Sequence, residues 1–189
     1  HALINGPISK KHLLDKKFSG ITEYLAHKTR TKNKEVMLIY NKSLSVCPVT
    51  THMALKNVSK KISSDDILNK ITTIYSFYKK KLKKIPRFAI TGLNPHCETK
   101  LNFSEEKKII IPAIKRAKNM NINVQGPLPT DTLFMKNIIK KYDVVLGMYH
   151  DQVITPMKTI YGFKAINITL GLPFIRISPD HGTNNKMLG

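Results

Sequence analysis

Residues 143–152 read Asp-Val-Val-Leu-Gly-Met-Tyr-His-Asp-Gln, and this stretch decides the fold class. The segment from Asp143 to Met148, apolar from Val144 onward, predicts a buried strand, and His150 and Asp151 follow where that strand ends. In open α/β sheets, ligands bind beyond the carboxyl ends of the strands. The stretch therefore predicts an α/β protein with polar chemistry at one edge of its sheet.

Strands and helices are predicted to alternate along the rest of the chain. Apolar runs indicate further strands at residues 2–4, 36–40, 44–49, 88–90, 122–125 and 165–170. Spacing and start signals indicate helices at residues 22–28, from 63 to 82, from 104 onward with Pro112 at a kink or near the first turn, and after Asp131 as an N-cap. This alternation predicts βαβ units and α/β layers.

The composition excludes several classes of protein. The chain has 189 residues, of which 41% are hydrophobic, and this content is enough for a core. No apolar run approaches the roughly 20 residues of a membrane span, and two cysteines outside any CxxC motif do not make a disulfide scaffold. No signal peptide is visible. Because the chain starts at His1 rather than Met, we expect a piece of something longer.

The formal net charge of +20 invites a nucleic-acid interpretation, which the details disfavour. Only four of the 32 basic residues are arginines, the residue type whose planar fork reads bases and clamps phosphates. The lysines are spread along the chain rather than gathered in one segment. We interpret most of them as solvated faces, and a basic nucleic-acid-binding module is the alternative from a different functional class.

Three histidines stand just past strand-like apolar runs: His52, His96 and His150. Three protein ligands and one open position are typical of a catalytic divalent metal, and neutral imidazole suits zinc and other transition metals. The three histidines are far apart in the sequence, so no local motif supports a metal site. A solvated or hydrogen-bonded loop histidine is the ordinary alternative for each.

Further polar residues are candidates for the same site. Asp131 and Asp151 can orient a ligand histidine through its second ring nitrogen, and for Asp131 this role is compatible with an N-cap. Four more side chains can together bind a phosphorylated, carboxylated small molecule: Thr22, Lys158, Asn167 and Arg176. Each alone can be an ordinary surface residue. Arg176, however, lies in an apolar run, where an arginine usually has an anionic partner.

The turn Asp180-His181-Gly182-Thr183 can approach the phosphate or adenosine of a cofactor, and a plain surface turn is the alternative. There is no GxGxxG fingerprint for a nucleotide, and no GxSxG or Cys/His pattern for a nucleophile. Cys97 directly follows His96, and we interpret it as a small space-filling residue.

Together, these segments resemble the 4-hydroxythreonine-4-phosphate dehydrogenase family of pyridoxal phosphate biosynthesis. The most specific matching stretches are residues 148–152 and 167–176; the others are residues 4–7, 22–25, 50–52, 92–96, 126–134 and 180–183. They follow the family's order from one end of the chain to the other. Residues 1–189 are therefore interpreted as a partial catalytic region, without the N-terminal portion and the C-terminal end of the family domain.

The resemblance implies both a fold and an activity. The fold is an isocitrate/isopropylmalate dehydrogenase-like α/β/α sandwich of two subdomains with a cleft between them, in a homodimer with active sites at the interface. The activity is that of a cytoplasmic oxidoreductase, which oxidises 4-phosphooxy-L-threonine with NAD and decarboxylates the product to 3-amino-2-oxopropyl phosphate. The resemblance implies neither a nucleic-acid nor a membrane partner.

By position, the resemblance also assigns roles to residues of this chain. The ligands of a divalent metal, zinc or else magnesium or cobalt, fall on His52, His96 and His150. The substrate contacts fall on Thr22, Lys158, Asn167 and Arg176. The catalytic groups fall on Asp131, Asp151 and Lys158, and the NAD contacts are expected at His181, Gly182 and Thr183.

One departure from the family keeps a second substrate open. The family has a histidine directly before the residue that matches Thr22, and this chain has Ile21 there. A related dehydrogenase acting on phosphorylated threonate or erythronate is therefore an alternative, as is a non-catalytic fragment that keeps only the fold.

Overall fold

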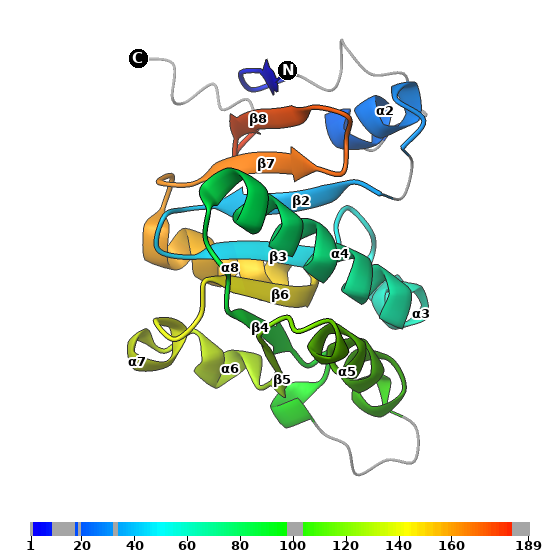
Figure 1. Cartoon of the computed structure of the whole chain (residues 1–189), viewed down its shortest axis with the longest axis vertical. Helices are drawn as coiled ribbons and strands as arrows, with labels where there is room; N and C mark the ends of the chain where they lie inside the picture. Colours follow the sequence, from blue (N-terminus) through cyan, green and yellow to red (C-terminus); the bar gives the residue numbers. More distant parts are fainter. Residues whose placement is uncertain (1, 9–17, 19, 32–33, 98–103, 183–189) are drawn as a thin grey trace.

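The computed structural model describes residues 2–8, 18, 20–31, 34–97 and 104–182. Within them, eight strands form one mixed sheet in the order β1-β8-β7-β2-β3-β6-β4-β5 (Figure 1). The strands are β1 Ala2–Ile4, β2 Val36–Tyr40, β3 Ser45–Thr50, β4 Phe88–Thr91, β5 Val124–Leu128, β6 Val144–Tyr149, β7 Ile166–Leu170 and β8 Ile175–Pro179. The α-helices are α2 Ile21–Lys28, α3 Val58–Lys61, α4 Ser64–Phe77, α5 Ile111–Asn119, α6 Thr130–Leu133, α7 Lys136–Ile139 and α8 His150–Tyr161. Shorter 3-10 or π-helical segments are η1 Leu55–Asn57, η2 Tyr78–Leu82, η3 Pro95–Cys97 and η4 Glu106–Ile110.

The sheet topology brings the carboxyl ends of four strands to one edge. Strands β3, β6, β4 and β5 are parallel neighbours in that order, with Thr50 of β3 opposite Tyr149 of β6. Strand β2 pairs antiparallel with β3 and β7, β8 pairs antiparallel with β7, and β1 pairs parallel with β8. The segments that carry the three predicted metal-binding histidines follow β3, β4 and β6, and so leave the sheet at this edge.

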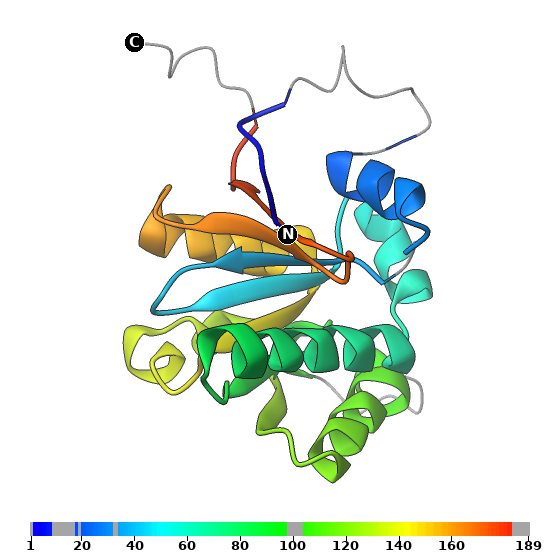
Figure 2. The same ribbon diagram turned by 45° about the horizontal axis from the view of Figure 1, so that its top comes forward.

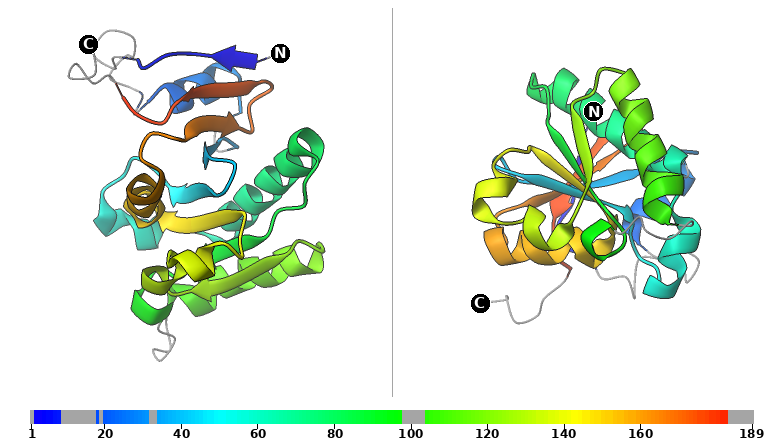
Figure 3. Two further views of the ribbon diagram at one scale, coloured as in Figure 1. Left: turned by 90° about the vertical axis from the view of Figure 1, so that its left-hand side faces the viewer. Right: turned by 90° about the horizontal axis from the view of Figure 1, so that it is seen from below.

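Helices cover both faces of the sheet because side chains alternate along each strand. In β6, Val144 and Leu146 pack into the core that α3, α4 and α5 share, whereas Val145 packs into the core that α6, α7 and α8 share. Figures 2 and 3 show α4 and α8 on opposite sides of the sheet. The predicted α/β/α sandwich is confirmed, while the second subdomain and the cleft between subdomains stay predictions.

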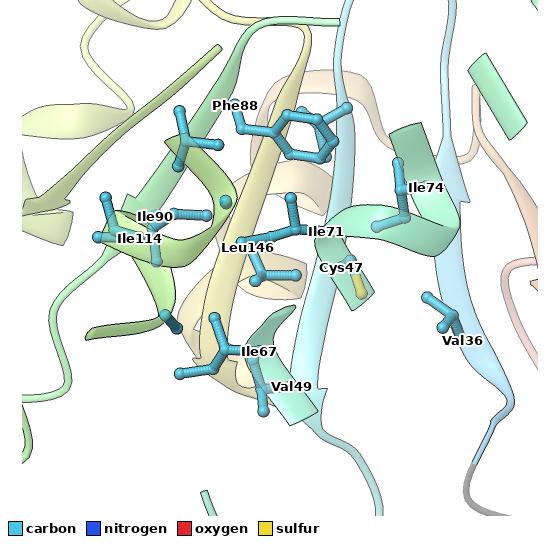
Figure 4. Packing of buried hydrophobic residues seen from close by; sticks show 14 of the residues in the cluster. Val36, Cys47, Val49, Ile67, Ile71, Ile74, Phe88, Ile90, Ile114 and Leu146 are labelled. Atoms are coloured by element: carbon cyan, nitrogen blue, oxygen red, sulfur yellow. The ribbon is translucent and has the colours of Figure 1, made fainter. Parts of the chain in front are cut away.

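Helix α4 shows how the sequence builds the larger core. The Ser63 hydroxyl oxygen accepts a hydrogen bond from the backbone N–H of Asp66 at 3.1 Å and caps the helix. Ile67, Ile71 and Ile74 repeat at helical spacing and are fully buried against the sheet (Figure 4). Burying each of these side chains contributes roughly 1.5–3 kcal/mol.

The amino ends of β4 and β6 are joined by a group of three residues, the Asp143 cluster, formed by Asp143, Lys84 and Arg87. The Asp143 carboxylate accepts hydrogen bonds from Lys84 Nζ at 2.7 Å and from the Nε and the backbone N–H of Arg87, both at 2.9 Å. Burial opposes ionisation, but these hydrogen bonds outweigh it and lower the pKa of Asp143 from 3.8 to about 2. Asp143 precedes β6 and His150 follows it, so the cluster lies at the opposite end of this strand.

The predicted elements are confirmed apart from some boundaries and one cap. Strand β5 begins at Val124, two residues later than predicted, because the Ile122 N–H donates to the Ala117 carbonyl oxygen at the end of α5 and pairing with β4 starts at Val124, opposite Phe88. The prediction that Asp131 is an N-cap is wrong: Pro129 precedes α6, and Asp131 lies in its first turn with Oδ1 accepting from the Thr132 N–H at 2.9 Å. The sequence patterns do not indicate α8 or β8. Among the described helices, none has the length and apolar character needed to cross a bilayer.

Candidate active site

One cavity of about 270 Å³ opens beside α8, between this helix and strands β2, β7 and β8. Its lining brings together the four residues predicted to bind substrate: Thr22 of α2, Lys158 of α8, Asn167 of β7 and Arg176 of β8. They are distant in the sequence, and they meet because β7 and β8 pair antiparallel, with Thr169 opposite Arg176. Helix α8 then carries Lys158 to the same wall.

Arg176 places a buried positive charge in the cavity wall. The residue is only 3% exposed. Its Nε donates a hydrogen bond to Asn5 Oδ1 at 2.8 Å, and its Nη1 donates to the hydroxyls of Thr22 and Thr169, both at 3.3 Å. These acceptors are neutral, so they orient the guanidinium without cancelling its charge. Burial lowers the pKa of Arg176, and the Glu23 carboxylate acts in the opposite direction.

Lys158 is held in the same cavity by a buried aspartate. Its Nζ lies 2.5 Å from Oδ2 of Asp180, whose side chain is 1% exposed, and 4.8 Å from the centre of the Phe163 ring. The Oδ1 atom of Asn167 is also buried, and no hydrogen-bond partner for it exists among the described residues. A buried acceptor without a partner is unfavourable, so a ligand that offers a hydroxyl or amino hydrogen would satisfy Asn167.

Two of the three predicted metal ligands, His52 and His150, lie side by side. They follow the parallel neighbours β3 and β6, and their ring centres are 6.1 Å apart. Oδ1 of Asp151 lies 2.6 Å from Nδ1 of His150, and Oε1 of Glu23 lies 3.4 Å from Nδ1 of His52. A carboxylate on Nδ1 fixes the imidazole ring and leaves Nε2 as the atom that binds a metal.

The third predicted ligand, His96, lies on the exposed turn η3 after β4 and does not line the cavity. His96 and Cys97 both have left-handed backbone angles, with φ of 57° and 56°, which are unfavourable for residues other than glycine. The buried Glu106 carboxylate holds this turn, because its Oε1 accepts the backbone N–H groups of Leu93 and Asn94, both at 2.8 Å. Among the residues that the structure describes, no three His, Cys, Asp or Glu side chains are grouped to hold a metal.

The two predicted catalytic aspartates are exposed and lie on different segments. Asp151 contacts His150, as described above. Asp131 lies near the His96 turn: burial raises the pKa of the Cys97 thiol, and the charge of Asp131 adds to that increase. Asp131 is therefore a neighbour of the His96 turn and not of the cavity lining.

The predicted cofactor contacts follow β8. His181 and Gly182 line the cavity, and Thr183 lies outside the described residues. The His181 ring packs edge-on against Phe163 at 5.3 Å between ring centres. The cavity therefore continues from the predicted substrate-binding residues to the turn predicted to approach a cofactor.

Sequence reasoning missed the orienting role of four residues: Asn5, Glu23, Glu106 and Asp180. Asn5 and Glu23 lie in the matching stretches 4–7 and 22–25, and Asp180 begins the turn predicted to approach a cofactor, but the sequence does not indicate the side chain that each of them contacts. Glu106 lies where the sequence indicates a helix start, but its carboxylate accepts from the backbone of a turn more than ten residues earlier.

The family model and the curated relatives that match this chain agree with one another. The family model described as "Pyridoxal phosphate biosynthetic protein PdxA" matches residues 1–189. The chain is 42% identical over 192 residues to a 4-hydroxythreonine-4-phosphate dehydrogenase of Sulfurihydrogenibium sp., covering 100% of this chain and 59% of the relative. It is 38% identical over 185 residues to a Salmonella typhi protein provisionally named D-threonate 4-phosphate dehydrogenase, covering 96% of this chain and 56% of that protein.

Solved structures give the same picture. The crystal structure of 4-hydroxythreonine-4-phosphate dehydrogenase from Klebsiella pneumoniae matches with a TM-score of 0.82 and 38% identity, over 96% of this chain and 56% of that one. A terephthalate 1,2-cis-dihydrodiol dehydrogenase from Burkholderia xenovorans matches with a TM-score of 0.79 at 20% identity, over 100% of this chain and 62% of that one, which shows likeness of fold alone. The chain spans 59% and 56% of the two curated relatives described above.

Proposed function

The chain belongs to the family of the pyridoxal phosphate biosynthetic protein PdxA, and from that premise we propose its reaction. We infer that the protein oxidises the hydroxyl of 4-phosphooxy-L-threonine with NAD and a divalent metal. The oxidised acid then loses CO₂ to give 3-amino-2-oxopropyl phosphate, in vitamin B6 biosynthesis in the cytoplasm. The observation that carries the proposal is the single cavity that joins Lys158, Asn167 and Arg176 with His52 and His150.

The cavity offers a complementary group for each polar part of this substrate. The Arg176 guanidinium and the Lys158 ammonium suit the phosphate and carboxylate, since charge-assisted hydrogen bonds are the strongest that side chains make. The buried Oδ1 of Asn167 suits a hydroxyl or amino hydrogen. The Thr22 hydroxyl lies beside Arg176 and provides a further donor and acceptor.

The histidines fit a divalent metal in their chemistry. His52 and His150 each have a carboxylate on Nδ1, which is how ligand histidines are usually oriented. We assign them as ligands, with His96 as the third, and the imidazole set favours zinc or cobalt over magnesium, which prefers oxygen ligands. When bound, the metal would acidify the substrate hydroxyl and stabilise the negative charge that develops during decarboxylation.

The protein must move protons in both steps. Oxidation transfers a hydride to NAD and releases the hydroxyl proton, for which we assign the carboxylates of Asp131 and Asp151 as candidate acceptors. After CO₂ leaves, the carbon needs a proton, and the Lys158 ammonium is a donor that lines the cavity. We assign the NAD contact to the turn of His181 and Gly182, continued by Thr183.

We also propose a homodimer with its active sites at the interface. The cavity contains the substrate residues and two histidines, whereas His96 and Asp131 lie on exposed segments outside its lining. A second copy of the chain would supply groups that one copy does not bring to the cavity. The exposed side chains Met53 and Leu55, which follow His52, would then be covered.

A related substrate remains an alternative because of one residue. Ile21 lines the cavity directly before Thr22 and offers no hydrogen bond where the family has a histidine. Relatives with the two substrate names are similarly close to this chain, at 42% and 38% identity. A sugar acid such as 4-phosphothreonate or 4-phosphoerythronate has the same phosphate and carboxylate but no amino group.

Steady-state kinetics of the full-length protein with NAD separate these alternatives. We expect kcat/KM for 4-phosphooxy-L-threonine to exceed that for either sugar acid by at least about tenfold, since a lost charge-assisted contact is worth about 1.5–3 kcal/mol. The variant Ile21→His is the matched test of the departure, and it should raise the ratio further. A clear preference for a sugar acid would show that the first substrate is wrong.

Metal analysis of the same protein tests the ligand assignment. His52→Ala, His96→Ala and His150→Ala should each lose bound zinc and dehydrogenase activity together. His27→Ala, an exposed helix histidine that does not line the cavity, is the matched control and should keep both. Retention of full metal occupancy by all three site variants would contradict the assignment.

A further inference from the structure

Gln152, in the first turn of α8, is buried and makes four hydrogen bonds that substrate binding does not use. The residue is 8% exposed. Its Oε1 accepts from the Thr91 hydroxyl at 2.8 Å and from the backbone N–H of Met148 at 2.7 Å. Its Nε2 donates to the Gly92 carbonyl oxygen at 2.7 Å and to the Thr130 hydroxyl at 3.1 Å. Both amide atoms therefore make two hydrogen bonds each, which is the full capacity of the side chain.

The groups that contact Gln152 belong to three segments, and each segment leads to a predicted site residue. The bond to Met148 fixes the end of β6, directly before His150. The bonds at the end of β4 fix the start of the loop that carries His96. The bond to Thr130 fixes the first residue of α6, directly before Asp131.

The backbone makes room for this amide. A Cβ atom on Gly147 would lie 2.4 Å from Cγ1 of Val153 and 3.2 Å from Oε1 of Gln152. Because such distances are too short, glycine is the residue that lets β6 run this close to α8. The close approach brings the Gln152 amide within reach of the ends of both β4 and β6.

We propose that Gln152 is a positioning residue of the active site, which sets His150, the His96 turn and Asp131 in one arrangement. The inference rests on the proposed function, because it takes these residues as metal ligands and as a catalytic group. Strands β4 and β6 pair along Phe88–Ile90 and Val144–Leu146, but the residues that carry the predicted ligands lie beyond this pairing. There a shift of an ångström would separate a ligand from its metal. Glutamate has nearly the same shape but lacks the two hydrogens that reach Gly92 and Thr130.

A buried hydrogen-bond network can also contribute to stability alone. The test therefore needs a measurement that does not change when only the stability of the protein changes. Ser45 is the matched control. Its hydroxyl lies 2.8 Å from the Tyr78 hydroxyl in the core, at the start of β3, and contacts none of the site segments. Ser45→Ala removes a buried hydrogen bond at the other end of the same group of strands.

The experiment titrates Co²⁺ into the metal-free full-length protein and records both the dissociation constant and the visible absorption of the bound ion. For Gln152→Met and Gln152→Glu we expect a dissociation constant about 10–100-fold higher than in the unsubstituted protein, as for other groups that orient metal ligands, and an altered spectrum. Ser45→Ala should keep the dissociation constant within about threefold and leave the spectrum unchanged, because it leaves the ligands in place. This should hold even if Ser45→Ala lowers the melting temperature as much as the Gln152 variants do.

Two results would overturn the proposal in different ways. If His150→Ala loses Co²⁺ but both Gln152 variants bind it as the unsubstituted protein does, the proposed metal site stands and Gln152 has only a structural role. If His150→Ala and the unsubstituted protein bind Co²⁺ equally, or neither binds it, the metal assignment fails and the inference fails with it. Should Gln152→Met not fold, Gln152→Glu and Thr91→Val, which removes one of the four bonds, carry the same test.

Discussion

Two buried aspartates, Asp143 and Asp180, each pair with a lysine, and they differ in how completely they are paired. In the Asp143 cluster, two cations and a backbone N–H donate hydrogen bonds to the carboxylate. Asp180 has an ion contact with Lys158 alone, and its Oδ1 has no hydrogen-bond partner within the part of the chain that the structure describes. Burial is similar, at 7% and 1% exposure of the side chains.

The difference separates charge that holds the fold together from charge that is available to a ligand. The Asp143 cluster is complete, so a ligand would only disrupt it. Lys158, Arg176 and Asn167 around Asp180 keep unused donors and acceptors that face a cavity. A buried polar group without a partner is unfavourable. The anionic groups of a phosphorylated amino acid would accept hydrogen bonds from Lys158 and Arg176, and its amino group would donate to the Asn167 oxygen.

Arg176 gives the strongest test of whether the charges of the cavity serve binding and not stability. Arg176→Lys keeps the positive charge but loses the planar fork and the bonds to Asn5 and Thr22. We expect kcat/KM to fall at least about 100-fold, mainly through KM, because the phosphate or carboxylate loses a bidentate partner. The melting temperature should fall only slightly, because lysine keeps the charge, and Asn5 and Thr22 line the cavity, where water can replace the lost hydrogen bonds. A large loss of stability with unchanged kinetics would mean that Arg176 stabilises the fold and does not bind substrate.

The Asp143 cluster should respond in the opposite manner. Asp143→Asn removes the charge to which Lys84 and Arg87 donate, and we expect the free energy of unfolding to fall by about 2 kcal/mol in denaturant titrations. Kinetic constants should not change, because the cluster lies at the far end of β6 from His150. The matched control is Asp65→Asn, which removes an ion pair with Arg116 in which the side chains are 83% and 50% exposed. It should change stability by less than about 0.5 kcal/mol.

Acid should weaken the same end of the sheet. The folded-state pKa of Asp143 is lowered from 3.8 to about 2, so the unfolded chain binds the proton more readily. The stabilisation is therefore present above pH 4 and is lost as the pH falls toward 2, by at most about 2 kcal/mol. Unfolding free energies measured between pH 2 and 5 should show a steeper slope for the unsubstituted protein than for Asp143→Asn. Equal slopes would mean that another carboxylate carries the acid sensitivity.

Much of the fold could be predicted because local patterns decide it. The isoleucines of α4 repeat at helical spacing, and the apolar runs of β2, β3, β4 and β6 end at turn or polar residues. Helix α8 and strand β8 could not be predicted in this way. Pro156 lies inside α8. In β8 the buried residues are the polar Arg176 and Ser178, whereas Ile175 and Ile177 are only partly buried, so tertiary contacts overrule the local signal.

The site was predictable in its residue types but not in its pairings. Positions after strand ends identify His52 and His150, because the edge of a parallel sheet collects them. The contacts of Glu23, Asp180 and Gln152 form only when distant segments come together in the fold. Such contacts produce no regular residue spacing that could be recognised in the sequence. For the same reason the sequence does not reveal that His96 stands apart from the other two histidines in one copy of the chain.

The smallest expected effect is at Asp180, and it closes the comparison with Asp143. Asp180→Asn is the same chemical change as Asp143→Asn, made at the incompletely paired aspartate. We expect a loss of less than about 1 kcal/mol in unfolding free energy. The Lys158 Nζ is buried against Asp180, but the side chain as a whole is 30% exposed and lines the cavity, so the ammonium can turn toward cavity water once the carboxylate charge is removed. We expect kcat/KM to fall about tenfold, because Lys158 loses the group that orients it toward the substrate. If Asp180→Asn instead destabilised the protein as much as Asp143→Asn and left the kinetics unchanged, both pairs would be structural, and completeness of pairing would not distinguish a binding site from a structural ion cluster.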